Sequence, residues 1–104
     1  MSRKYHAALP RKWHGLARVF SAVGDEQRQR ILLMFEREEE LTIKDIFEAC
    51  PLSRTAVTHH IRVLREAGVL VAEKRGKEVF LKPDPDVVLD AMDRLRGYIE
   101  EELQ

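Results

Sequence analysis

The sequence predicts a mainly α fold with a small β-hairpin: a winged helix-turn-helix of about five helices plus a two-stranded wing. Two short amphipathic helices follow each other across a tight break at residues 49–52. A hairpin with a basic, glycine-containing turn comes next, at residues 69–82. Helical apolar periodicity flanks both features, over residues 10–22 and 86–103. Because the chain has 104 residues, we expect one domain, residues 1–104.

The first predicted helix spans residues 10–22. Pro10 suits its first turn, where proline is favoured. The apolar side chains Trp13, Leu16 and Phe20 recur at helical spacing and therefore share one face. This face is a candidate for contact with a second copy of the chain.

Capping residues indicate where the next two helices begin. Asp25 fits the N-cap of the second helix, which we expect to end in the charged run of residues 36–40. Thr42 fits the N-cap of the third helix, and Asp45 three residues later forms a variant of the capping box. The third and fourth helices together form the predicted helix-turn-helix, residues 42–67.

The fourth helix is expected at residues 54–66, with Gly68 as its C-terminal stop, and has a polar outer face. Val57, Ile61 and Leu64 are spaced to face the core, and Ser53 before them is a good N-cap that also suits a phosphate. The second helix of a helix-turn-helix enters the major groove, where such side chains bind bases or phosphates. Polar helix faces are usually only solvated, but this one has no acidic residue. It consists of Arg54, Thr55, Thr58, His59 and Arg62.

The hairpin of residues 69–82 is a candidate wing. Lys74, Arg75 and Lys77 surround Gly76 at its turn. A two-stranded ribbon with a basic tip can follow a phosphate backbone or enter the minor groove. An ordinary exposed hairpin would have a similar composition, but its position directly after the helix-turn-helix favours the wing.

The charges are segregated along the chain. The net charge is zero, with 18 basic and 18 acidic residues, which alone does not favour nucleic acid. Residues 1–18 and 53–82 are nevertheless basic, at +5 and +4, whereas residues 25–50 and 83–104 are acidic, at −4 and −5. Such alternation can produce a positive face on one side of the fold.

The last predicted helix, residues 86–103, carries an apolar seam with the spacing of a coiled coil. Together with the face of the first helix, this seam predicts the interface of a homodimer, and 44% apolar residues give only a modest core for one chain. The predicted interface residues are Trp13, Leu16, Phe20, Val88, Met92, Leu95 and Ile99.

Four stretches resemble the ArsR-type (SmtB-type) family of winged-helix repressors, over residues 13–103. They are AVGDEQR with the following Ile31 and Leu32, LSRTAVTHHI, RVLREAGVL and KRGK. The resemblance implies a homodimeric repressor that binds an inverted-repeat DNA operator and dimerises through its first and last helices. It also implies DNA contacts at Arg54, Thr55, Thr58 and His59.

The sequence lacks the metal sites that many members of this family use. Thr42, Ile43 and Lys44 stand where the third helix would carry a Cys-x-Cys motif, and residues 86–104 hold no histidine or cysteine. Carboxylates alone bind hard cations at best. We therefore expect no metal and no cofactor, and no motif selects an effector.

Other classes of protein fit the sequence less well. There is no phosphate loop, nucleophile elbow or metal triad, so we expect no enzyme. Cys50 is the only cysteine, so an intrachain disulfide is excluded. No apolar run is long enough to span a bilayer. We therefore expect a cytoplasmic, nucleoid-associated protein. The main alternative is a winged-helix module for protein–protein contact. Such a module would carry apolar or acidic residues on the outer face of the fourth helix.

Overall fold

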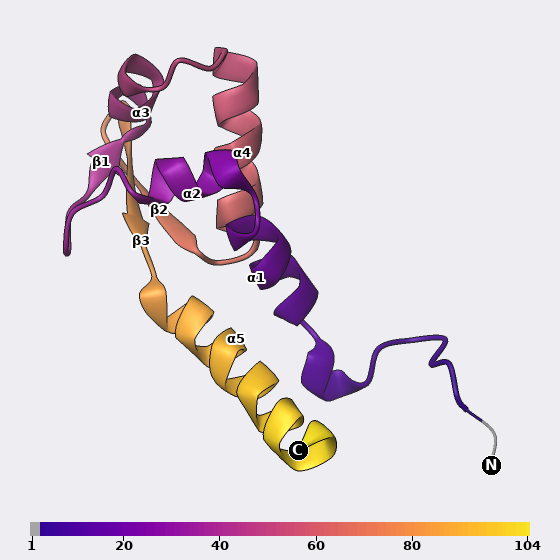
Figure 1. Ribbon diagram of the computed structural model, residues 1–104. Helices are drawn as coiled ribbons and strands as arrows, with labels where there is room; N and C mark the ends of the chain where they lie inside the picture. Colours follow the sequence, from indigo (N-terminus) through magenta and orange to yellow (C-terminus); the bar gives the residue numbers. More distant parts are fainter. Residues whose placement is uncertain (1–2) are drawn as a thin grey trace.

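The computed structural model describes residues 3–104 (Figure 1). It confirms the predicted mainly helical fold with a small antiparallel sheet. A 3-10 turn, Arg11–Trp13, precedes the first helix, and a turn of π-helix, Ile99–Leu103, ends the last one. The elements between them are α1 (Leu16–Val23), α2 (Glu26–Leu32), β1 (Leu41–Thr42), α3 (Ile43–Ala49), α4 (Arg54–Glu66), β2 (Leu70–Arg75), β3 (Glu78–Pro83) and α5 (Pro85–Tyr98).

The first helix is shorter than predicted, and the expected continuous helix over residues 10–22 is wrong. Gly15 adopts a left-handed conformation with φ 84°, which ends the preceding turn and lets α1 begin at Leu16. The guanidinium of Arg94 on α5 stabilises this break, because it donates to the backbone carbonyls of Lys12 and His14. The break is therefore supported by a contact with the far end of the chain.

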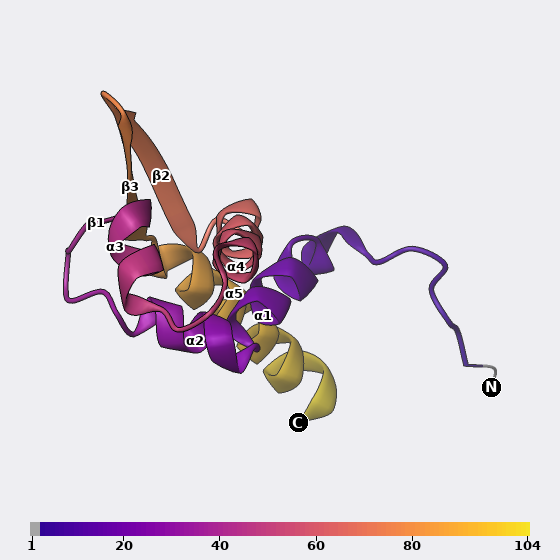
Figure 2. The ribbon, with the colours of Figure 1, turned by 90° about the horizontal axis from the view of Figure 1, so that it is seen from above.

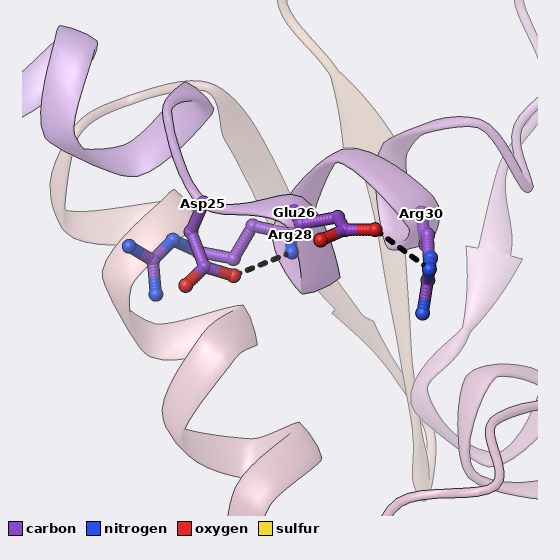
Figure 3. Close-up of polar contacts among 4 residues, drawn as sticks. All are labelled: Asp25, Glu26, Arg28 and Arg30. Atoms are coloured by element: carbon purple, nitrogen blue, oxygen red, sulfur yellow. Dashed lines mark hydrogen bonds and ion pairs between the residues drawn. The ribbon is translucent and has the colours of Figure 1, made fainter.

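The predicted caps of α2 and α3 are confirmed. Asp25 accepts a hydrogen bond from the backbone N–H of Arg28 at 3.0 Å (Figure 3). Thr42 and Asp45 form the reciprocal capping box, at 3.0 and 2.9 Å. However, α2 ends at Leu32, before the charged run in which we expected it to end.

The sheet has three strands in the order β1–β3–β2, all antiparallel. The predicted hairpin is β2–β3, which is paired from Leu70 with Pro83 to Arg75 with Glu78. Strand β1 was not predicted, because two residues are too short to show a strand period; Leu41 pairs with Leu81. Figure 2 shows the hairpin projecting beyond the helices, with α4 beside its base.

The core lies where α1, α2, α3 and α4 meet the base of the sheet. The prediction that Val57, Ile61 and Leu64 face inward is confirmed, because at most 4% of each is exposed. No helix in the described part of the chain is long and apolar enough to cross a membrane. The other fully or nearly fully buried large side chains are Leu16, Val19, Ile31, Ile46, Val69, Leu70 and Leu81.

Candidate nucleic-acid interface

The orientation of α4 leaves its predicted outer face open to solvent. The hydroxyl of Ser53 accepts from the backbone N–H of Ala56 at 3.1 Å and caps the helix. The buried side chains on the opposite face then fix the rotation of α4 about its axis. All six predicted residues of this region are exposed: Ser53, Arg54, Thr55, Thr58, His59 and Arg62.

Arg54 is oriented by a contact with the neighbouring helix of the helix-turn-helix. Its guanidinium lies over the ring of Phe47 on α3, 4.9 Å from the ring centroid. A cation–π contact at an exposed site contributes roughly 0.5–1 kcal/mol and leaves the N–H donors free to bind other groups. Arg54 is therefore held at the amino end of α4 without neutralisation of its charge.

Arg65 belongs to the same surface, although the sequence-based prediction did not include it. Its side chain is exposed, and it lies one turn beyond Arg62 and two turns beyond Thr58 on the same side of α4. The sequence already indicated this position, because Arg65 follows Arg62 by three residues and Thr58 by seven, which is the spacing of one helix face. A groove of about 420 Å³ follows this side of the helix, lined by Ile43, Thr58, Ile61, Arg62, Arg65 and Glu66.

The turn of the hairpin presents two of its three predicted cations. Gly76 has φ 61°, a conformation that glycine adopts without strain and that closes the tight turn. Lys74 and Lys77 beside it are exposed. Neither forms an ion pair with any carboxylate of residues 3–104.

Arg75, the third predicted cation of the wing, is turned toward carboxylates instead. Its Nη2 lies 2.8 Å from Glu40 and 2.8 Å from Glu73, and its guanidinium covers the ring of Phe80 at 4.6 Å. The hydrogen bond from Arg75 lowers the pKa of Glu73, and the two carboxylates raise the pKa of Arg75. Arg75 thus fastens the hairpin to the loop before β1.

The residues at the positions of the family's thiolate site have structural roles here. Thr42 caps α3, and Lys44 lies 4.0 Å from Glu48 on the same helix. Within residues 3–104, no three His, Cys, Asp or Glu side chains lie close enough to hold a metal ion together. Cys50 is half-buried against the core, and this burial raises the pKa of its thiol.

Six of the seven predicted interface residues keep surface that a second copy could contact. Leu16 is the exception, because only 4% of it is exposed and it packs inside the chain. Trp13 lies edge-on to Tyr98, with ring centroids 4.8 Å apart. A largely apolar groove of about 700 Å³ runs along α5, and its apolar lining is Phe20, Leu89, Met92, Leu95 and Ile99.

The helix-turn-helix, the exposed basic face of α4 and the wing define a winged helix-turn-helix protein. Comparison with known proteins supports this class. A helix-turn-helix domain family matches residues 23–72. A solved ArsR-like transcriptional regulator from Rhodococcus sp. RHA1 superposes with a TM-score of 0.75 at 26% identity, covering 86% of this chain and 83% of that one.

Two relatives give the family. The HTH-type transcriptional regulator YceK of Bacillus subtilis is 34% identical over 71 residues, which is 65% of this chain and 71% of YceK. The arsenic resistance transcriptional regulator ArsR1 of Pseudomonas putida is 34% identical over 84 residues, which is 79% of this chain but only 64% of ArsR1. The chain belongs to the ArsR (SmtB) family of winged helix-turn-helix transcriptional regulators. This membership places it among regulators rather than enzymes.

Proposed function

We propose that this chain is a homodimeric transcriptional repressor that binds an inverted-repeat DNA operator without a resident metal. The exposed face of α4 is the observation that supports this function best. Over three turns it presents arginine, threonine and histidine, with no acidic side chain before Glu66. A repulsive carboxylate is therefore missing where phosphates and bases would approach.

The geometry of α4 and the hairpin suits a division of roles on DNA. Arg54 and Thr55 lie in the first turn of α4, the part of a recognition helix that contacts base edges. Lys74 and Lys77 lie on a ribbon that projects beyond the helices (Figure 2) and would contact the phosphate backbone. We assign base recognition to the first pair and sequence-independent affinity to the second. Such a protein would act in the cytoplasm at the nucleoid.

The apolar surface of α5 supports the homodimer. About half of Leu89 and Met92 is exposed, at 54% and 52%, although both lie on a groove that is mostly apolar. A second copy related by a two-fold axis would cover the same groove on both subunits. The two recognition helices would then contact half-sites about 34–36 Å apart, or a multiple of this distance.

Selection of DNA fragments from a random pool by the purified protein tests the function. We expect an enriched inverted repeat, and Arg54→Ala should weaken binding to it by about 1–3 kcal/mol per lost base contact while relaxing the preference at one position per half-site. Arg30 on α2 is an exposed arginine paired with Glu26, and Arg30→Ala is the matched control. This control should leave both the affinity and the base preference unchanged. Enrichment without dyad symmetry, or none at all, would contradict the proposal.

A further inference from the structure

Arg28 is the only buried charged side chain among residues 3–104, with 9% of it exposed. It belongs to α2, yet Figure 3 shows its guanidinium extending away from that helix, whereas the neighbouring Arg30 stays on the surface and pairs with Glu26 at 2.7 Å. A buried guanidinium is costly unless its donors are satisfied. The partners of Arg28 therefore indicate what the side chain does.

Two of these partners belong to the last turns of α1. The Nε of Arg28 donates to the backbone carbonyl of Ala22 at 2.9 Å, and its Nη2 donates to that of Ser21 at 3.1 Å. The last carbonyls of a helix have no N–H partner within the helix and can accept hydrogen bonds from elsewhere. A cation at this end also interacts favourably with the helix dipole. Arg28 is thus fixed to the end of α1.

The third partner is on α4. The Nη1 of Arg28 lies 3.1 Å from Nδ1 of His60, which is half-buried. Because arginine can only donate, Nδ1 of His60 is the acceptor in this contact. One rigid guanidinium therefore connects the carboxyl end of α1 to the middle of α4.

We propose that the contact between Arg28 and His60 is a positioning link that sets the recognition helix relative to the dimer-forming side of the protein. This inference rests on the proposed function, since α1 lies beside α5 and α4 carries the face toward DNA. His60 also adjoins His59 of that face, with ring centroids 5.5 Å apart. In a dimer, two such links fix the separation and the rotation of the two α4 helices.

The spacing of the half-sites is the property that such a link controls. One inserted base pair moves a half-site by about 3.4 Å along the DNA axis and turns it by about 35° around that axis. A dimer with rigidly held recognition helices must distort the DNA or lose contacts to bind the longer site. A dimer whose α4 helices can shift tolerates the insertion better.

Two substitutions of His60 test the link. His60→Leu removes the acceptor, whereas His60→Gln retains one in the amide carbonyl. The probes are the duplex recovered by selection with the wild-type protein and the same duplex with one base pair inserted between its half-sites. Binding is measured by fluorescence anisotropy, and the readout is the ratio of the two affinities.

We expect the wild type and His60→Gln to lose about tenfold or more in affinity on insertion, and His60→Leu to lose less than about threefold. All three should sediment as dimers. Arg28→Lys, which keeps the charge but not the planar fork, should behave like His60→Leu, and Arg30→Lys should behave like the wild type. If Arg28→Lys does not fold, the comparison of His60→Leu with His60→Gln tests the link without it, because His60 is only half-buried.

The outcomes separate this inference from the function on which it rests. A dimeric His60→Leu variant with the full penalty for insertion overturns the link, even if the variant is less stable, because a purely structural role would lower stability without changing the ratio. A wild-type protein that selects no DNA sequence overturns the proposed function and the link together. Relaxed spacing in His60→Leu with normal spacing in His60→Gln supports both.

Discussion

Replacing Lys77 with glutamine removes one cation from the turn of the hairpin without changing the backbone conformation at Gly76. Each phosphate that a protein neutralises contributes about 0.9 to the slope of log affinity against log salt concentration. A dimer carries two copies of Lys77, so we expect the slope to become shallower by about 1.8. Between 50 and 200 mM KCl, the wild type should then lose about tenfold more affinity than the variant does.

The same experiment with Arg75 distinguishes a phosphate contact from a structural ion pair. Arg75 already lies 2.8 Å from both Glu40 and Glu73, so Arg75→Gln should leave the salt slope close to that of the wild type. These pairs are partly exposed, and such pairs contribute about 0–1 kcal/mol to stability, so the variant should remain folded. Anisotropy titrations on one operator duplex at four salt concentrations measure both slopes.

Two results would refute this reasoning. Equal flattening of the slope by Arg75→Gln and Lys77→Gln would mean that Arg75 leaves its carboxylates when DNA binds. An unchanged slope for Lys77→Gln would mean that the hairpin turn does not contact the backbone. Arg30→Gln on α2 serves as the control for loss of a cation elsewhere.

Three further predictions concern assembly, metals and acid stability. Leu95→Asp places a charge in the apolar groove of α5 and should give monomers or unfolded chain in sedimentation; a monomeric wild type at micromolar concentration would contradict the interface. Micromolar zinc, cadmium or arsenite, titrated into a preformed complex in reducing buffer, should not release the operator; release at one equivalent from a Cys50→Ser variant would show an unrecognised site. Hydrogen bonds with Thr42 lower the pKa of the Asp45 carboxyl in the folded protein. The ionised Asp45 side chain therefore stabilises the fold above about pH 4, and this stabilisation is lost as the pH falls through the lower folded pKa. Asp45→Asn should therefore flatten the acid side of a thermal-unfolding profile, and a profile with the wild-type shape would contradict the cap.

Local signals were sufficient for α4. Ser53 as N-cap, the inward spacing of Val57 and Ile61, and Gly68 after the last turn all indicated the same helix, residues 54–66, and the structure has these bounds. Gly68 adopts φ 79°, as expected for a glycine that ends a helix. Agreement among cap, periodicity and stop explains why this prediction was accurate.

Contacts between distant residues account for what the sequence did not predict. The break at Gly15 is stabilised by Arg94, eighty residues from the His14 carbonyl that it binds. Apolar periodicity across the break still fits one continuous helix, so periodicity alone could not reveal it. Likewise, the partner of Arg28 on α4 is 32 residues away, and nothing in the local pattern marks His60 as its acceptor.

The folded structure also changes which charges are available to DNA. A count along the sequence treats every arginine as surface charge, but Arg28, Arg75 and Arg94 bind backbone carbonyls or carboxylates of the same chain. The proposed DNA-facing surface then has five cations per subunit: Arg54, Arg62, Arg65, Lys74 and Lys77. If each neutralises one phosphate, ten cations in a dimer limit the salt slope to about 9. A steeper measured slope would require cations from outside this surface, and residues 3–12, with four basic side chains and no acid, are the segment whose neutralisation should then restore the limit.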